Sequence, residues 1–588
     1  MIDNTRIETA NDHAAALSLI NPFDIDRVEV IKGANSALAG TGAFGGVVNV
    51  ITKSPSFSDQ QYVNGEAMSR YESVNNSYAE YVAAESGSDV YRVRASGVFR
   101  KADNYQSPAG EVPNSDFSDW GFSTEAGVRL LNTQSLDLTY QRYQTDDAGI
   151  PGGSSLFPAS ATVRYTLARR ELFKAEYSIP ELSETLPMLV VRASQQNIER
   201  DVELIASPVV TKTPHAEHKT GTVQTELTIV PTENHYLTVG AELWQRSLSS
   251  GRESYNYAAQ TILEEVPLPN SSFTSAGAYA QDEWSIIPHS TTIVLGARYD
   301  AIRVHNDVTY DTVWVVKNGV TTVPATQKVL WNANTSNTES WSMNAGVRQV
   351  MTPWLDGSAV FSTAFRTPEL EELYQLLNNN PQLFYVGNPN LQPEKNQSVD
   401  ARIRYHIPNI IFSVDGYYNA YHDLIGYTYG TFEGTPAYIK ANIGEARIYG
   451  YEFSLELFPI DALKLRSTFE YIRGEDTKNH VNLTGIVPMH GMMTADYSLQ
   501  RLGSLHAAWE LYDDKTNLGS GEIPTAGYGI VDLGVVSVPL PMGSTYANIS
   551  FGVQNIFNRS YTNFLSTLRG NYNYEPGRNL YLAASYHF

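Results

Sequence analysis

The sequence predicts an all-β protein, a transmembrane antiparallel β-barrel of about 22 strands. From about residue 60 to the C-terminus, stretches of roughly 9 to 15 residues alternate between apolar and polar side chains. The connectors between these stretches alternate between short and long, as they do in membrane barrels. The average hydropathy is polar, and no run approaches the roughly 18 apolar residues of a transmembrane helix. These three observations exclude a helical membrane protein and are compatible with a membrane barrel.

The first predicted element is a strand, a turn-rich loop and a second strand between Phe23 and Lys53. Within the loop, Gly40, Gly42 and Gly45 match G-x-G-x-x-G, the spacing of a dinucleotide fingerprint. That fingerprint requires a helix directly after the glycines, whereas a β-branched strand follows Gly46. The glycines therefore indicate a tight backbone turn rather than a nucleotide site.

The following strands are illustrated by GAYAQDEW, in which Ala278, Ala280 and Trp284 share one face and Tyr279 and Gln281 the other. A helix would need apolar residues to recur near every 3.6 positions, which these segments lack. The same alternation recurs in TTIVLGARYDAIRV, DGSAVFSTAF, NQSVDARIRYHI, IIFSVDGYYNAY, YGYEFSLELF and the final NLYLAASYHF.

The predicted connectors fall into two classes. Short turns are expected near 86–89, 132–134, 231–235, 288–290, 408–409, 460–462 and 501–503. Long loops are expected at 104–120, 148–170, 250–270, 305–338 and 369–396. A β-propeller would show a repeated blade motif of about 40 residues, and we find none.

The amino-acid composition excludes several kinds of site and partner. The chain has 588 residues and no cysteine, so disulfides and thiolate metal sites are excluded. The formal net charge of -22 argues against nucleic-acid binding and would help to attract cationic ligands. The 37 tyrosines outnumber the 21 phenylalanines, and amphipathic rings of this kind form interfacial girdles, although a soluble all-β protein would also use them.

Two N-terminal segments, IDRVEVIKG and SALAGTGAFGGVVNVITK, closely resemble the plug signature of TonB-dependent outer-membrane receptors. The resemblance implies a small plug inside a 22-stranded barrel, with residues 1–57 as the C-terminal part of the plug and residues 58–588 as the barrel. The plug-signature residues are Arg27, Glu29, Gly33, Gly40, Gly42, Gly45, Gly46 and Asn49.

Later segments resemble the same family. AFRTPELEELY and GNPNLQPEKNQSVD resemble its paired FRAP and NPNL boxes, and NIGEARIYGYE, VQNIFNRSY and EPGRNLYL resemble its C-terminal half. The last strand ends on Phe588, which resembles the signal read by the barrel-assembly machinery. The FRAP-like and NPNL-like boxes imply a loop site, or loop architecture alone. The expected ligand-binding residues are Arg366, Tyr374, Phe384, Tyr385, Asn388 and Asn390.

No metal or resident cofactor is expected, although two clusters contain side chains that can bind a metal. His215 and His218 lie close together in what reads as an outward loop, and Met489 precedes His490. Imidazole and thioether groups suit a soft metal such as copper. Haem receptors of the family typically place a histidine between the two boxes, and this sequence has none between Arg366 and Asn388.

The resemblance predicts a receptor that imports a scarce ligand. An iron–siderophore complex is the leading candidate ligand, and haem, cobalamin, copper or a glycan are the alternatives. A passive porin normally has 16 to 18 strands and needs no plug. An enzyme finds little support, because G-x-S-x-G and H-E-x-x-H motifs are missing.

The family's uptake is driven by the TonB–ExbB–ExbD complex through an N-terminal box. That box is expected upstream of a segment resembling 1–7, so the chain as given should not support energised uptake. The location implied is the bacterial outer membrane, among lipid and lipopolysaccharide, as a monomer.

Overall fold

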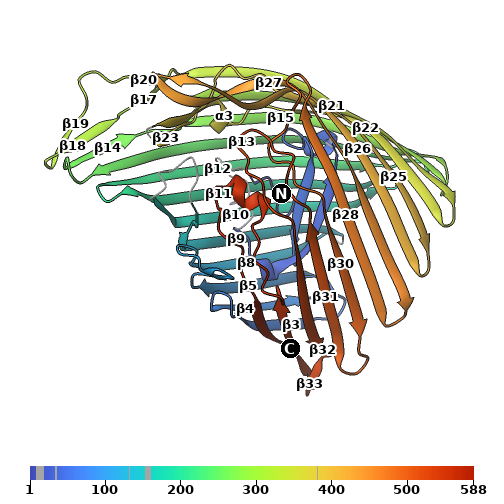
Figure 1. Cartoon of the computed structure of the whole chain (residues 1–588). Helices are drawn as coiled ribbons and strands as arrows, with labels where there is room; N and C mark the ends of the chain where they lie inside the picture. The colour runs from blue at the N-terminus through green and yellow to red at the C-terminus, as the bar shows by residue number, and fades with distance from the viewer. Residues whose placement is uncertain (8–18, 34–35, 132, 153–160, 381) are drawn as a thin grey trace.

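The computed structural model describes the chain except for residues 8–18, 34–35, 132, 153–160 and 381. Its architecture is a closed antiparallel barrel of 22 principal strands, which confirms the predicted fold class (Figure 1). In chain order these strands are β3 (Tyr62–Glu72), β4 (Ser77–Gly87), β5 (Tyr91–Ala102), β8 (Phe117–Leu130), β9 (Gln134–Gly149), β10 (Thr162–Ser183), β11 (Leu186–Ser207), β12 (Val210–Ile229), β13 (His235–Asn256), β15 (Ser271–Ile287), β16 (Thr291–Asn306), β21 (Asn334–Thr352), β22 (Leu355–Arg366), β25 (Glu394–Ile407), β26 (Ile410–Phe432), β27 (Thr435–Ile460), β28 (Leu463–Asp476), β30 (His490–Ser498), β31 (Gly503–Tyr512), β32 (Tyr528–Ser537), β34 (Thr545–Gln554) and β35 (Asn579–His587).

The last strand closes the ring against the first. β35 pairs antiparallel with β3, from Glu66↔His587 to Glu72↔Tyr581. The Gly65 amide also donates to the Phe588 carbonyl at 2.7 Å. Closure removes the free sheet edges whose unpaired backbone groups are too costly in hydrocarbon.

The strand alternation separates the two faces of the wall as predicted. On β4, Tyr81 and Ala83 are buried toward the lumen, while Val82 between them is 56% exposed on the outside. Exposed apolar side chains recur outward on neighbouring strands, including Phe99, Phe122, Leu138, Phe173, Val191, Val223 and Leu243. These side chains form an apolar outer belt suited to lipid.

Short connectors join the strands at one end, among them 88–90, 184–185, 288–290, 408–409 and 461–462. Longer segments occupy the other end and contain the small elements β6 (Gln106–Ser107), β7 (Gly110–Glu111), β14 (Thr261–Glu265), β17 (Thr309–Tyr310), β18 (Trp314–Lys317), β19 (Val320–Thr322), β20 (Val329–Trp331), α3 (Leu370–Tyr374), β23 (Leu376–Asn380), β24 (Leu383–Val386), β29 (Val481–Asn482) and α4 (Phe564–Leu568). A further short strand, β33 (Leu540–Met542), pairs with β34 at the short-turn end.

The five predicted long loops all overlap neighbouring strands and are therefore shorter than expected. The expected loop at 148–170 begins inside β9 and ends inside β10, and the one at 250–270 begins inside β13. These strands have 16, 22 and 22 residues, about twice the 9 to 11 needed to cross a membrane. The barrel wall therefore continues beyond the apolar belt as paired hairpins.

The predicted N-terminal strand–turn–strand is present. After the 3-10 turn η1 (Pro22–Asp24), β1 (Ile25–Lys32) pairs antiparallel with β2 (Gly46–Thr52), and α2 (Ser36–Ala39) lies in the connector. This hairpin, blue in Figure 1, lies inside the barrel. Within the described part of the chain, the helices are all too short and polar to cross a membrane.

Candidate ligand site at the mouth of the barrel

The loop between β22 and β25 folds over the barrel mouth and is fixed by charge. Arg366 ends β22 and forms ion pairs with Glu372 at 2.8 Å and Glu394 at 2.6 Å. Glu369 caps α3 in a capping box with Glu372, which receives the Glu369 amide at 3.0 Å. β22 ends at Arg366, and Pro368 lacks the N–H group that would continue the ladder.

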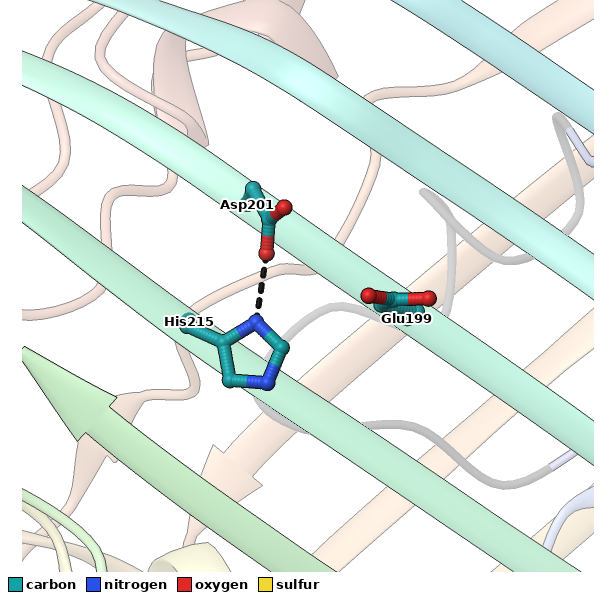
Figure 2. A group of neighbouring side chains, drawn as sticks. All are labelled: Glu199, Asp201 and His215. Atoms are coloured by element: carbon teal, nitrogen blue, oxygen red, sulfur yellow. Dashed lines mark hydrogen bonds and ion pairs between the residues drawn. The ribbon is translucent and has the colours of Figure 1, made fainter.

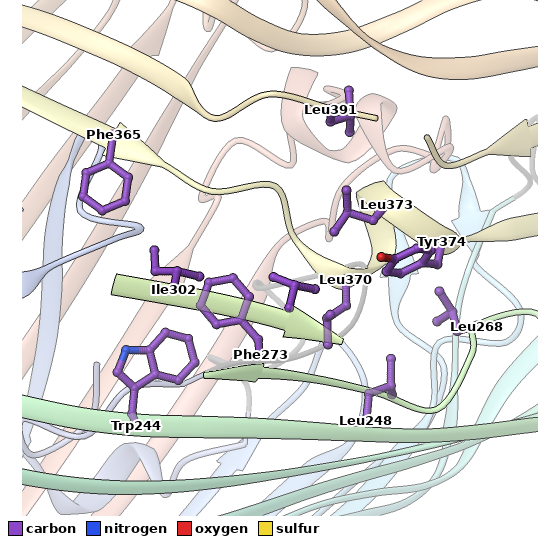
Figure 3. Close-up of a cluster of buried hydrophobic side chains, with 11 residues drawn as sticks. Trp244, Leu248, Leu268, Phe273, Ile302, Phe365, Leu370, Leu373, Tyr374 and Leu391 are labelled. Atoms are coloured by element: carbon purple, nitrogen blue, oxygen red, sulfur yellow. The ribbon is translucent and has the colours of Figure 1, made fainter. Parts of the chain in front are cut away.

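Apolar contacts hold α3 against the wall. Leu370, Leu373 and Tyr374 pack with Trp244 of β13 and Phe273 of β15 in one buried cluster (Figure 3). The Trp244 and Phe273 rings stack with centroids 4.9 Å apart. Burying each large apolar side chain stabilises the loop by about 1.5–3 kcal/mol. Tyr374, one of the expected ligand-binding residues, is only 2% exposed and belongs to this loop core; its contact with a ligand stays a prediction.

The electrostatics of the loop follow from these contacts. Burial raises the pKa of the Glu372 carboxyl, but the charges of Arg366 and Lys440 lower it more, so the net pKa lies below the ordinary value of 4.5. Glu372 is therefore ionised at neutral pH. Lys440 Nζ lies 3.4 Å from Glu372, which links the loop to strand β27.

Tyrosine side chains gather where the loop meets the end of the β26–β27 hairpin. Beyond the last β25 partner, His422, the two strands of this hairpin continue to pair with each other and project past the neighbouring wall strands. β24 adds to β27 in parallel through Phe384, Tyr385 and Val386. This pairing brings Tyr385 beside the projecting hairpin.

We call Tyr385, Tyr427, Tyr429 and Tyr438 the aromatic patch. The Tyr385 ring lies 5.6 Å from that of Tyr427 and 5.4 Å from that of Tyr438, and Tyr429 lies 5.6 Å from Tyr438. Tyr429 is 70% exposed and Tyr427 is 41% exposed. Lys440 Nζ sits 4.3 Å from the centre of the Tyr427 ring, a cation–π contact.

The remaining expected residues surround this patch. Phe384 packs against a small apolar cluster of Leu376, Val386 and Ala437. Asn388 donates to the Lys440 carbonyl at 3.0 Å, and its side-chain oxygen accepts from the Asn390 amide at 3.0 Å. Asn390 is exposed. The structure thus brings Arg366, Phe384, Tyr385, Asn388 and Asn390 to one region; their contact with a ligand remains a prediction.

Three patch members, Tyr427, Tyr429 and Tyr438, were not expected from the sequence. The run GYTYG shows alternating tyrosines, but strand alternation alone does not separate a projecting hairpin from a membrane strand. The long-range β24–β27 pairing leaves no local sequence signal, so the patch could be found only from the structure.

The plug segment contacts the mouth loop from the lumen side. The Thr367 amide donates to Thr41 Oγ1 at 3.4 Å, and Asn396 donates to the Phe44 carbonyl at 2.9 Å. The α2 helix lies against β15, β16, β21 and β22. A ligand bound to the mouth loop would therefore touch a segment that is itself in contact with the plug.

The plug-signature residues shape the connector. Gly40 has a φ of +75°, and a Cβ there would lie 2.7 Å from Arg298 Nη2; a Cβ at Gly46, with φ +145°, would lie 2.6 Å from the Ile31 carbonyl oxygen. Both positions therefore need glycine. The same connector contains Gly33, Gly42 and Gly45. β2 begins at Gly46, which confirms that no helix follows the glycines.

Polar signature residues hold the hairpin. Asn49 is buried and donates to the Asn4 side chain at 2.8 Å. Arg27 and Glu29 form an exposed ion pair at 2.9 Å on β1. A surface pair of this kind contributes little to stability.

A buried ion network ties the plug segment to the wall. Glu242 on β13 accepts from Arg6 Nε at 3.2 Å and from Arg298 Nη2 at 2.8 Å. Arg6 also donates to the Thr41 carbonyl at 3.0 Å, and Arg298 pairs with Asp300 at 2.7 Å. The side chains of Glu242 and Arg298 are 6% and 0% exposed. Such a network resists opening because removing one charge leaves another buried and unbalanced.

The metal candidates occupy different surroundings. His215 and His218 were expected in a loop, but both lie in β12, where the wall extends beyond the apolar belt. His218 is 1% exposed and His215 lies on the opposite, exposed face, so the two do not converge. His490, just after Met489, lines a lumen cavity of about 800 Å³, 3.4 Å from Glu470.

The closed barrel, the hairpin inside it and the folded mouth loop define a plugged outer-membrane receptor. The chain belongs to the TonB-dependent receptor family. The family model described as "TonB dependent receptor-like, beta-barrel" matches residues 56–556, and the "TonB-dependent Receptor Plug Domain" model matches residues 1–47.

Curated relatives are receptors and transporters. The chain is 22% identical to a hemin receptor of Yersinia enterocolitica, over 90% of this chain and 76% of the relative. It is 22% identical to the vitamin B12 transporter BtuB of Vibrio vulnificus strain YJ016, over 100% and 84%. It is 21% identical to the ferric aerobactin receptor of Klebsiella pneumoniae, over 96% and 81%.

Solved structures share the fold. The copper transporter OprC superposes with a TM-score of 0.84 at 16% identity, over 100% of this chain and 92% of that chain. The ferric yersiniabactin receptor FyuA of Yersinia pestis gives 0.75 at 12% identity, over 96% and 85%. The family and its relatives confirm an outer-membrane importer of a small ligand, coupled to TonB, rather than an enzyme.

Proposed function

We propose that this receptor imports an iron–siderophore complex and that the aromatic patch is where the complex first binds. The observation in support is the group of four tyrosines on a projecting hairpin, directly beside the loop that contacts the plug. Tyrosine rings offer flat apolar contact with a hydroxyl at the rim, which suits the organic periphery of such complexes. Lys440 at the patch is paired with Glu372, so the patch favours a ligand of low net charge.

Haem is the second candidate. Relatives from Yersinia enterocolitica and Yersinia pestis are named hemin receptors. A tyrosine oxygen can serve as an axial ligand to haem iron, and the patch presents four. Among the residues that the structure describes at the mouth, none favours cobalamin, copper or a glycan over these two ligands.

The plug segment and the mouth loop are in contact through the hydrogen bond from the Thr367 amide to Thr41 Oγ1. We infer that ligand binding biases the plug segment and that the TonB–ExbB–ExbD complex supplies the energy to displace it. The proposal also divides the chain into a plug at residues 1–57 and a barrel at residues 58–588. It further includes contact with lipopolysaccharide, assembly by the barrel-assembly machinery and a monomeric state.

The test is a titration of the purified chain in detergent, followed by quenching of intrinsic fluorescence. The ligands are ferric catecholate, hydroxamate and mixed siderophores, haemin and cyanocobalamin. We expect saturable binding of at least one ferric siderophore. Tyr427→Ala should weaken that binding about tenfold, because an aromatic contact with a ligand contributes on the order of 1 kcal/mol beyond its buried area.

Tyr257→Ala is the matched control, because Tyr257 is a 58% exposed tyrosine on a different hairpin tip. It should bind as the unchanged chain does. Saturable binding of haemin with a shifted Soret band, and of no siderophore, would replace the first candidate with the second. Equal loss in Tyr427→Ala and Tyr257→Ala would remove the patch from the proposal.

A further inference from the structure

Three side chains on neighbouring strands form a compact group of metal donors. Glu199 and Asp201 lie on β11, and His215 lies on β12 directly opposite Asp201. One donor atom from each residue lies within 4.8 Å of the other two, and His215 Nδ1 is 2.5 Å from an Asp201 oxygen (Figure 2). Within the described ranges of the chain, this is the one group of three such donors.

The group lies on the outer face of the wall, away from the plug. Gln196 of β11 points into the lumen, where it donates to the Arg6 carbonyl at 2.8 Å. Because successive strand side chains alternate, the odd-numbered Glu199 and Asp201 point outward. His215 shares that face, with 46% of its side chain exposed. Ions in the surrounding water can therefore reach all three donors.

The group also lies beyond the apolar belt. Val191 on β11 and Val223 on β12 are outward apolar residues of the belt. The outward residues of β11 from Gln195 to Glu203 are polar, and the next exposed apolar one is Ile205 near the end of the strand. Glu199 is eight positions farther along β11 than Val191, or about 26 Å at 3.3 Å per residue. The donors thus stand on the polar part of the wall near the 208–209 connector, where hydrated ions are available.

We propose that Glu199, Asp201 and His215 bind one Zn²⁺ ion, or a divalent transition metal of similar preference. Imidazole nitrogen with carboxylate oxygen is a donor set that zinc accepts, whereas Mg²⁺ and Ca²⁺ take oxygen donors. Three protein donors leave a fourth position for water. Arg169 binds one Glu199 oxygen and so orients the carboxylate, leaving its other oxygen for the metal.

The experiment is a competition titration of Zn²⁺ between a chromophoric chelator and the full, tag-free chain in detergent. We expect one equivalent of bound zinc. His215→Gln and Asp201→Asn should each lower the affinity at least about tenfold, since each removes one donor. Co²⁺ in place of zinc should give visible d–d absorption that His215→Gln abolishes.

A matched control exists on the opposite wall. His506 and Asp496 form a cross-strand pair at 2.7 Å with similar exposure, 49% and 47%, and belong to no three-donor group within the described residues. They share the lumen-facing side of β30 and β31 with His490 and Glu510. His506→Gln should leave zinc affinity unchanged. The proposal fails if the unchanged chain binds no better than His215→Gln, or if His506→Gln weakens binding as much as His215→Gln does. All variants should migrate on a gel as folded barrels, so that a difference in zinc affinity is caused by the site and not by misfolding.

Discussion

A single wall carboxylate, Glu242, balances two arginines that face each other across the plug boundary. In Glu242→Gln, both guanidinium groups lose a charged partner while Asp300 still pairs with Arg298. Breaking a buried pair in this way costs about 3 kcal/mol. Hydrogen exchange of the plug hairpin, residues 25–52, should therefore accelerate on the order of 100-fold.

Glu226→Gln provides the comparison for this residue. Glu226 also belongs to the wall, on β12, but it accepts a hydrogen bond at 3.0 Å from the hydroxyl of Tyr279, another wall residue. Its loss should leave exchange in the plug hairpin unchanged. Similar acceleration in both variants would mean that general weakening of the barrel, and not the Glu242 network, controls the plug.

At the scale of elements, the mouth loop should be sensitive to acid. The pKa of Glu372 is lowered relative to 4.5, so its ion pairs stabilise the folded loop at neutral pH, and this contribution is lost as the pH falls through the lowered pKa. The hydrogen-exchange protection factors of 367–393, which correct for the pH dependence of intrinsic exchange, should be high at pH 7 and lower near pH 3. We expect the Glu372 ion pairs to stabilise the folded loop by about 1.5–3 kcal/mol, the usual contribution of hydrogen bonds to a charged group.

Glu372→Gln separates this effect from general acid unfolding. The variant should show low protection factors in 367–393 already at pH 7, with little further change on acidification. If the variant instead keeps the pH response of the unchanged chain, another carboxyl group controls the loop.

The sequence predicted elements where a local pattern determines structure, and it missed those that depend on distant contacts. The plug hairpin followed from β-branched runs on either side of a glycine-rich turn. The loops at 148–170 and 250–270 were misjudged because strand pairing beyond the membrane needs no apolar face. The aromatic patch depends on parallel pairing between β24 and β27, which brings together residues about 50 positions apart.

At the scale of the whole molecule, barrel stability depends on closure by β35. Removing residues 579–588 would delete the partner of both β3 and β34 and leave two open edges. Unpaired backbone groups at such edges cost several kcal/mol each in hydrocarbon. We expect the full chain to migrate faster on a denaturing gel before heating than after, and the shortened chain to show no such shift. A milder change, Val82→Thr on the outer belt, should keep the shift, because it leaves every strand pairing intact. A heat-dependent shift in the shortened chain would contradict closure through β35 as the step that completes the barrel.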